Sequence, residues 1–248
     1  MKKLIIIGSS GFVGKSLNDF FKKKKKIKLL NYSRTEGKNI LNIKKLPRTD
    51  YIIYCINNKN IKKSLNYFFY FKKLLKKSYK NNYKKFSGYK KNYSKEKYVL
   101  ENEFKKIAKE GFKVSIARGF TFYGKHILNY NYLISKLIQA IKTKKKFKIY
   151  NPYIIRSYMH SDDMCRWLMK IIDNSSNKCP VVNLGCDKII DIKKFASFLN
   201  EKFDADISIN EKSIKKIDFY VPSINYAKKY LKLKNTVNFN NAITSLIK

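Results

Sequence analysis

The sequence predicts an α/β protein with a mostly parallel sheet that helices cover on both faces. Two observations support this prediction. Apolar segments of strand length alternate with segments whose apolar residues recur at helical spacing. The chain also opens with an apolar strand that runs into a glycine-containing turn and then a helix. A chain of 248 residues is long enough for one such domain with a small second lobe.

The expected strands and helices follow one another along the chain. Apolar runs predict strands over residues 2–7, 27–32, 50–56, 113–118 and 180–185. Helical spacing predicts helices over residues 12–21, 61–75, 94–110, 132–141 and 162–172. A weak, lysine-broken strand over residues 83–87 fills a further place in the sheet. From Ile192 onward we expect shorter, mixed structure that caps one edge of the sheet.

The turn after the first strand carries three of the nine glycines. Gly8 supplies a tight turn, Gly11 lets the backbone approach a phosphate, and Gly14 lets the helix lie close to its strand. The arrangement suits a dinucleotide pyrophosphate at the helix N-terminus, where N–H groups have no helical partner. The spacing is G-x-x-G-x-x-G rather than G-x-G-x-x-G, so a plain strand-turn-helix remains the alternative.

The formal charge of +39 points first to nucleic acid or an anionic membrane surface. Only five of the 56 basic residues are arginine, however, although arginine is the preferred reader of phosphates and base edges. The lysines are spread along the whole chain together with many Asn, Ile and Tyr residues, which favours a compositional bias of an AT-rich genome. We therefore expect loose, salt-sensitive association with polyanions but no specific nucleic-acid partner. No apolar run approaches the ~20 residues that a membrane span needs, so no membrane partner is expected.

Cysteine and histidine usage argues against a metal site. The four cysteines form no C-x-x-C pair, which suits a reducing cytoplasm without a disulfide framework or a zinc site. Only His126 and His160 are available, so a histidine-based triad has little to draw on. His160 lies in an N-capping segment, and we expect the following helix to begin at Ser161 or Asp162.

A tyrosine and a lysine form the strongest candidate for catalysis. Tyr93 and Lys97 are four residues apart at the start of an expected helix, so they share one face of it. A fixed cation beside a phenol favours the phenolate, which makes tyrosine a usable proton shuttle near neutral pH. Tyr-x-x-x-Lys alone is a poor signal in a chain this rich in both residues. Its position after a glycine-turn unit and before a strand that ends at Arg118 strengthens it.

Five segments resemble, in order, the patterns of one family over nearly the whole chain. They are Gly8–Gly14 (G-x-x-G-F-[IV]-G), Tyr93–Glu101 (Y-x-x-x-K-x-x-x-E), Arg118–Gly124 (R-x-x-N-v-Y-G), Arg156–Met164 (R-d-f-v-h-v-d-D-v) and Val182–Gly185 (y-N-l-G). The chain is thus similar to the extended short-chain dehydrogenase/reductases, also called the NAD-dependent epimerase/dehydratase family. The C-terminal segment around Ala227–Leu231 resembles the closing pattern of that family.

The resemblance implies a Rossmann-type doubly wound sheet with a small, interleaved C-terminal substrate lobe. The expected boundaries are 1–124 and 157–190 for the dinucleotide-binding domain, and 125–156 and 191–248 for the substrate lobe. It also implies a nucleotide-sugar epimerase or reductase that transfers hydride between a sugar carbon and the nicotinamide of NAD or NADP.

The resemblance also assigns roles to residues. Tyr93 is the acid/base, Lys97 holds the nicotinamide ribose and lowers the tyrosine pKa, and Arg156 meets the substrate diphosphate. Thr121, where the family has Asn, lies toward the substrate. The expected cofactor contacts are Gly8, Ser10, Gly11, Phe12, Val13, Gly14, Arg34 and Lys97. The second strand leads into Ser33-Arg34 without an acidic residue, which favours NADP slightly because arginine accepts a 2′-phosphate.

The chain departs from the family before Tyr93, where a segment is shortened. Ser87 is the candidate for the third catalytic hydroxyl, in a remnant of the strand that normally carries it. Because of this departure and the large charge, a non-catalytic binding or scaffold protein of the same fold, associated with RNA, remains the alternative. We also expect a homodimer, formed through the aromatic helix from Ile61 to Leu75.

Overall fold

The computed structural model describes most of the chain. The described residues are 1–22, 26–35, 38–56, 61–78, 85–91, 95–129, 132–210 and 217–248, and the side chains of 61–62, 85–91, 95–97 and 128–129 are outside the description.

The described strands form a central parallel sheet of six strands in the order β2-β1-β3-β4-β5-β10. Its strands are β1 (Lys2–Ile7), β2 (Ile27–Tyr32), β3 (Tyr51–Tyr54), β4 (Lys85–Lys91), β5 (Lys113–Gly119) and β10 (Val181–Leu184). The chain goes from β1 to β2 on one side and then returns to β3 on the other side. The order therefore reverses between β1 and β3, and ligands of such sheets bind at the carboxyl ends of the strands beside this point.

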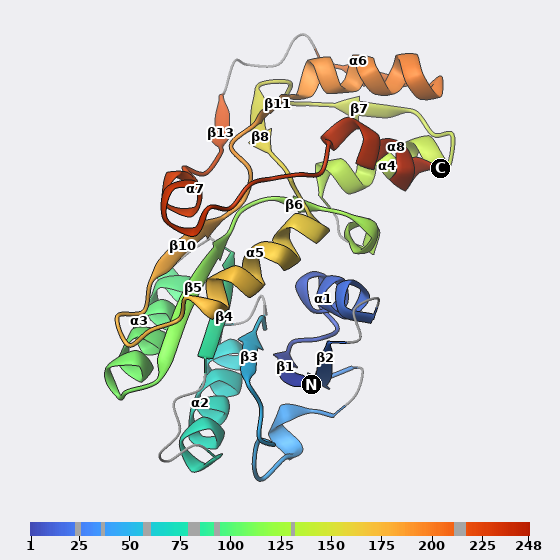
Figure 1. The fold of residues 1–248 in the computed structure, drawn as a ribbon. Coiled ribbons are helices and arrows are strands. Elements are labelled where there is room, and N and C mark those ends of the chain that lie inside the picture. The colour runs from blue at the N-terminus through green and yellow to red at the C-terminus, as the bar shows by residue number, and fades with distance from the viewer. Residues whose placement is uncertain are drawn as a thin grey trace.

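Helices cover both faces of this sheet (Figure 1). Helices α1 (Phe12–Lys22) and α5 (Ser161–Asp173) pack on one face, and α2 (Ile61–Ser78) and α3 (Lys95–Lys109) on the other. The side chains of β1 alternate accordingly: Leu4 and Ile6 face the first pair of helices, while Ile5 and Ile7 face the second. A parallel strand buried on both faces needs such a continuous apolar run, which is the pattern in the sequence.

A second, smaller lobe lies beyond the carboxyl ends of the strands (Figure 1). Its core joins residues of β6 to those of α4, α6 and α8. The small strands are β6 (Phe122–Tyr123), β7 (Phe147–Ile149), β8 (Ile154–Ser157), β9 (Met159–His160), β11 (Ile189–Asp191), β12 (Ile207–Ile209) and β13 (Asp218–Tyr220). The remaining helices are α4 (Leu133–Lys142), α6 (Ile192–Phe203), α7 (Asn225–Leu231), α8 (Phe239–Ile247) and the short 3₁₀ helices η1 (Ile40–Asn42) and η2 (Lys125–Asn129). The domain boundaries given above stay a prediction.

The structure confirms the doubly wound α/β fold. The weak strand before Tyr93 exists as β4 and lies in the middle of the sheet, where it pairs with β3 and β5. Pairing on both sides stabilises a strand whose own sequence is a poor strand former. The helix at residue 161 begins at Ser161 as expected, and His160 is its cap, since its Nδ1 accepts a hydrogen bond from the N–H of Asp162. After Ile192, only α7 packs beside the edge strand β10, while α6 and α8 build the second lobe.

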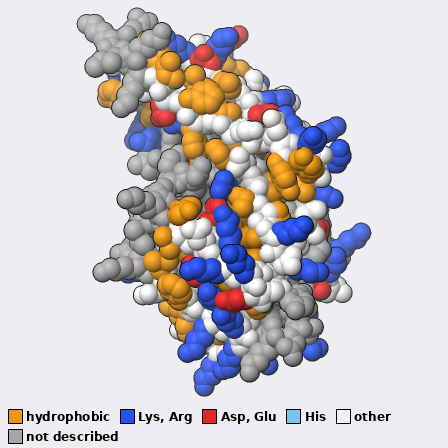
Figure 2. Space-filling view, turned by 90° about the vertical axis from the view of Figure 1, so that its left-hand side faces the viewer, with side chains coloured by type: hydrophobic (Ala, Val, Ile, Leu, Met, Phe, Trp, Pro, Cys, Tyr) orange, Lys and Arg blue, Asp and Glu red, His pale blue; other side chains and the backbone are white. Residues whose placement is uncertain are grey.

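Three further features concern the surface, the cysteines and the length of the helices. Basic side chains are scattered among apolar ones over the face in Figure 2. The four cysteines are free and buried. Among the helices described, no segment has the length and hydropathy of a membrane span.

Candidate active site

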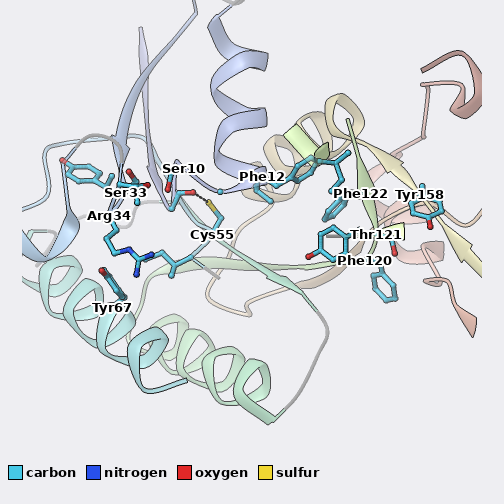
Figure 3. A pocket seen from close by; sticks show the side chains of 18 of the residues that line it. Ser10, Phe12, Ser33, Arg34, Cys55, Tyr67, Phe120, Thr121, Phe122 and Tyr158 are labelled. Atoms are coloured by element: carbon cyan, nitrogen blue, oxygen red, sulfur yellow. Dashed lines mark hydrogen bonds between the residues drawn. The ribbon is translucent and has the colours of Figure 1, made fainter. Parts of the chain in front are cut away.

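A cavity of about 670 Å³ opens at the carboxyl ends of β1, β2 and β3 and extends to the second lobe. It lies at the reversal of strand order, where this fold binds its ligands. Figure 3 shows Arg34 and Tyr67 at one end, Ser10 and Cys55 in the middle, and Thr121 and Tyr158 at the other end. The residues that line it are Gly8, Ser10–Val13, Tyr32–Thr35, Asn39, Ile40, Cys55, Ile56, Tyr67, Phe120–Phe122, Ile127, Tyr132, Leu133, Ile154, Arg156 and Tyr158.

The three glycines of the turn have different surroundings. Gly8 has φ +99°, and a Cβ there would lie 2.9 Å from the carbonyl carbon of Cys55. A Cβ on Gly14 would lie 2.4 Å from the Cα of Ser9, so this glycine lets α1 pack directly on the turn. A Cβ on Gly11 would meet only the carbonyl oxygen of Gly8, at 3.5 Å. Gly11 is therefore the position where the protein itself leaves room for a ligand beside the first N–H groups of α1.

The end of the cavity beside β2 is polar and basic. The backbone N–H groups of Gly8 and Ser9 donate to the carbonyl of Tyr32 at 2.8 and 3.2 Å, which joins the glycine turn to the end of β2. Arg34 follows directly, and its side chain extends toward Tyr67 of α2 (Figure 3). Tyr67 belongs to the aromatic helix from Ile61 to Leu75 that was expected to form the dimer contact. Its neighbours Phe68 and Phe71 are core residues, but Tyr67 itself lines the cavity.

The other end of the cavity is formed by residues of the second lobe and its connections. Phe122 of β6 stacks on Phe12 at the start of α1, with ring centroids 6.2 Å apart. The carbonyl of Thr121 accepts a hydrogen bond from the N–H of Met159 at 2.9 Å, which fixes the chain where it leaves the sheet. Arg156 of β8 lies at this end and forms an ion pair with Asp218 of β13. Asp218 carries no local signal in the sequence, because its partner Arg156 lies 62 residues away.

The residues expected to catalyse the reaction are not among the described residues that line this cavity. Tyr93 is outside the described residues, and Lys97 lies in the first turn of α3, with its side chain outside the description. Ser87 lies on β4 at the level of Ile53 and Ser115, well before the strand ends at Lys91, and its side chain is also outside the description. The catalytic roles of these three residues stay predictions.

The glutamate of the same motif holds α3 against the sheet. Glu101 accepts hydrogen bonds from Nη2 and Nε of Arg118 at 2.7 and 3.1 Å, and from Nζ of Lys105 at 3.0 Å. Burial raises the pKa of the Glu101 carboxyl, but the hydrogen bonds from Arg118 and Lys105 outweigh it, so the pKa lies below its ordinary value. Phe120 and Thr121 follow Arg118 closely, so this pair connects the helix of Lys97 to the wall of the cavity.

The buried thiol of Cys55 has a structural role. It donates to the carbonyl of Ile7 at 3.2 Å, and burial raises its pKa to about 12. A thiol in this state is not a nucleophile near neutral pH.

The charged side chains that line the described part of the cavity are all arginines. The chain has 51 lysines and five arginines, yet two of the arginines and none of the lysines line the cavity in the described part of the structure. No Asp or Glu lines it there either. Arginine binds phosphate oxygens through two parallel hydrogen bonds, so an arginine at each end suits a ligand pair with anionic groups at both ends.

Comparison with known proteins agrees with this geometry. The model of the NAD dependent epimerase/dehydratase family matches residues 70–185. No curated protein matches the sequence. Among solved structures, UDP-N-acetylglucosamine 4-epimerase from Bacillus cereus has a TM-score of 0.81 and 15% identity, with 100% of this chain and 98% of that chain covered.

Two further structures are similar at comparable levels. RMD from Pseudomonas aeruginosa, complexed with NADPH, has a TM-score of 0.79 and 12% identity, with 100% of this chain and 96% of that chain covered. UDP-glucose 4-epimerase from Thermotoga maritima, with UDP-glucose, has a TM-score of 0.77 and 15% identity, with 99% and 97% covered. The motifs and the fold agree with this family match over residues 70–185, and the solved structures show that the chain has the fold of these epimerases.

Proposed function

We propose that the protein is an NAD(P)-dependent epimerase or reductase of nucleotide sugars. One observation carries the proposal: a single cavity contains an open glycine turn between two arginines and has no acidic residue among its described lining. The turn suits a pyrophosphate, Arg34 suits an anionic group on the adenosine ribose, and Arg156 suits the diphosphate of a sugar nucleotide. Solved structures with this fold contain NADPH, UDP-glucose or NAD, which agrees with the proposal.

The dinucleotide fits the residues that are present. Gly8 and Gly14 keep the turn compact, and Gly11 leaves space beside the start of α1, where the first N–H groups of a helix have no helical partner. When bound, the nicotinamide supplies or accepts the hydride. Tyr93 would exchange the proton of the sugar hydroxyl, and Lys97 would keep the phenol acidic enough for this near neutral pH. Thr121 and Arg156 would orient the sugar nucleotide at the second-lobe end.

The cofactor preference follows from the residues after β2. An acidic residue at this place would accept hydrogen bonds from a ribose 2′-hydroxyl, but the chain has Ser33, Arg34 and Thr35, which all line the cavity. Arg34 would pair with a 2′-phosphate, so we propose a preference for NADP over NAD.

Two further parts of the proposal concern the oligomeric state of the protein and its location in the cell. Phe69 of α2 and Tyr98 and Val99 of α3 are 51%, 67% and 44% exposed, and we propose that these two helices pair with a second copy of the chain. The free, buried thiols fit a reducing compartment, so we propose a cytoplasmic location.

Titration of the purified protein with NADPH and NADH, followed by nicotinamide fluorescence, tests the proposed function. We expect tighter binding of NADPH, and Arg34→Ala should remove about tenfold of that preference, since it removes a charge-assisted contact to the phosphate. Arg48→Ala is the matched control, because Arg48 is exposed and does not line the cavity. Absence of dinucleotide binding together with tight RNA binding at physiological salt would support the scaffold alternative instead.

Tyr93→Phe tests the chemistry. With a panel of UDP-sugars and their keto derivatives, we expect turnover to be abolished while cofactor binding stays unchanged. Full turnover by this variant would exclude Tyr93 as the acid/base.

A further inference from the structure

Strand β13 holds Arg156 from two sides. Nη1 of Arg156 donates to the backbone carbonyls of Ile155 at 3.0 Å and Asp218 at 2.6 Å, and Nη2 donates to Oδ2 of Asp218 at 2.5 Å. The guanidinium carbon lies 5.7 Å from the ring centroid of Tyr220. These contacts arise because β13 pairs in parallel with β8, with Tyr220 opposite Arg156 in the register.

The guanidinium still has donors available for a ligand. Arginine has five N–H groups, and the three hydrogen bonds just given use both on Nη1 and one on Nη2. The N–H on Nε and the second N–H on Nη2 have no partner among the described residues. The side chain lines the cavity and is only 18% exposed. Two donors on one rigid, planar group match two oxygens of a phosphate.

We propose that Asp218 is a positioning residue, which fixes Arg156 so that its remaining N–H groups receive the diphosphate of the nucleotide sugar. This inference rests on the proposed function and names a residue for the substrate end of that same site. An arginine side chain has many rotamers, and a ligand that has to order it loses affinity. Asp218 orders it before the ligand arrives.

Tyr220 connects this arrangement to the sheet. Its ring stacks on Phe120, with centroids 4.9 Å apart and an interplanar angle of 28°, and Phe120 lines the cavity directly after β5. Arg156, Tyr220 and Phe120 thus form a continuous stack from the second lobe to the sheet. The stack keeps the guanidinium at a fixed place relative to the glycine turn.

Asp218 has a competing interpretation with the opposite consequence. A carboxylate on Arg156 also repels a diphosphate and competes with it for the guanidinium. If competition were the main effect, removal of Asp218 would tighten diphosphate binding. If positioning is the main effect, removal of Asp218 weakens binding, whereas Asn, whose side-chain oxygen still accepts from Nη2, preserves it.

Calorimetric titration with UDP and with inorganic pyrophosphate distinguishes the two effects. We expect Asp218→Ala to weaken binding of both probes about tenfold, because the charge-assisted contact of Arg156 to phosphate needs a fixed geometry. Asp218→Asn should stay within about threefold of the parent protein. In the Arg156→Ala background, Asp218→Ala should cause no further loss, because Asp218 acts only through Arg156.

Two controls separate this effect from general damage. Asp187→Ala removes an ion pair with Lys228 outside the cavity and should leave binding of both probes unchanged. NADPH titration of Asp218→Ala reports on the opposite end of the cavity and should match the parent protein.

Three results would overturn the inference: no binding of UDP or pyrophosphate by the parent protein, equal or tighter binding by Asp218→Ala, or an equal loss in the Arg156→Ala background. A parent protein that binds both probes but no dinucleotide would contradict the proposed function and leave the role of Asp218 intact.

Discussion

Substitution of Gly11 by Ala separates the cofactor role of the glycine turn from its structural role. The backbone at Gly11 does not have the positive φ that disfavours alanine, and the added Cβ would lie 3.5 Å from its nearest neighbour, the carbonyl oxygen of Gly8. The unfolded chain loses freedom, which stabilises, while alanine is a poorer residue than glycine before a helix, which destabilises. We therefore expect the free energy of unfolding to stay within about 1 kcal/mol of the parent value and Tm within about 4 °C.

The same methyl group should interfere with a bound pyrophosphate. It would occupy the space between the turn and the first N–H groups of α1, and overpacking of this kind costs about 1–3 kcal/mol. That cost corresponds to roughly 5- to 150-fold weaker binding of NADPH. Thermal unfolding of the free protein and fluorescence titration with NADPH measure the two effects on the same samples.

Gly14→Ala is the matched control. Its Cβ would lie 2.4 Å from the Cα of Ser9 and 2.5 Å from the carbonyl oxygen of Gly8, so α1 cannot keep its place on the turn. We expect a loss of about 2 kcal/mol or more in stability even without cofactor. The reasoning would be refuted if Gly11→Ala bound NADPH as the parent protein does, or if Gly14→Ala were as stable as the parent protein.

Three other substitutions test the packing of α3, a helix cap and the dimer. Arg118→Met leaves the buried Glu101 carboxylate with Lys105 as its remaining described partner, so we expect a loss of about 2–3 kcal/mol in urea unfolding. His160 caps α5 as a hydrogen-bond acceptor, so its imidazole must be neutral there. Burial lowers the pKa of His160 in the folded protein. The stability that the cap contributes is therefore complete above the unfolded pKa of 6.5 and is lost as the pH falls toward the folded pKa. His160→Asn, whose cap does not titrate, should therefore flatten the decrease of Tm between about pH 7 and pH 5. Phe69→Glu should convert the expected dimer to a monomer in light scattering, because it places a charge in an apolar interface.

Each of these substitutions has a control. Lys76→Met removes an exposed ion pair with Glu110 and should change stability by less than about 0.5 kcal/mol, and an equal loss would show that burial does not matter for Glu101. If Tm of His160→Asn depended on pH as Tm of the parent protein does, titration of the His160 cap would not contribute to stability. Ile189→Glu alters another exposed apolar residue and should leave the dimer intact, whereas a dimeric Phe69→Glu protein would exclude the α2 and α3 interface.

Local patterns in the sequence determined most of the fold. The continuous apolar run of β1, the glycine turn and the helical spacing after Phe12 are each visible within a few residues, because strands buried on both faces and helices with one apolar face leave periodic patterns. The turn and the end of β2, where a cofactor was predicted, both reach the cavity, since Gly8, Ser10–Val13 and Arg34 line it. Thr121 and Arg156 line its other end, and their contact with a substrate stays a prediction.

Tertiary structure alone decided the remaining features. The place of β4 in the middle of the sheet depends on pairing with β3 and β5, which compensates for its weak strand sequence. Tyr67 lines the cavity while Phe68 and Phe71 are buried in the core, a division that depends on how α2 packs on the sheet. Asp218 meets Arg156 only because β13 pairs with β8. Such contacts join residues far apart in the chain, so their geometry exists only after the elements have packed, and no period or spacing in the sequence encodes it.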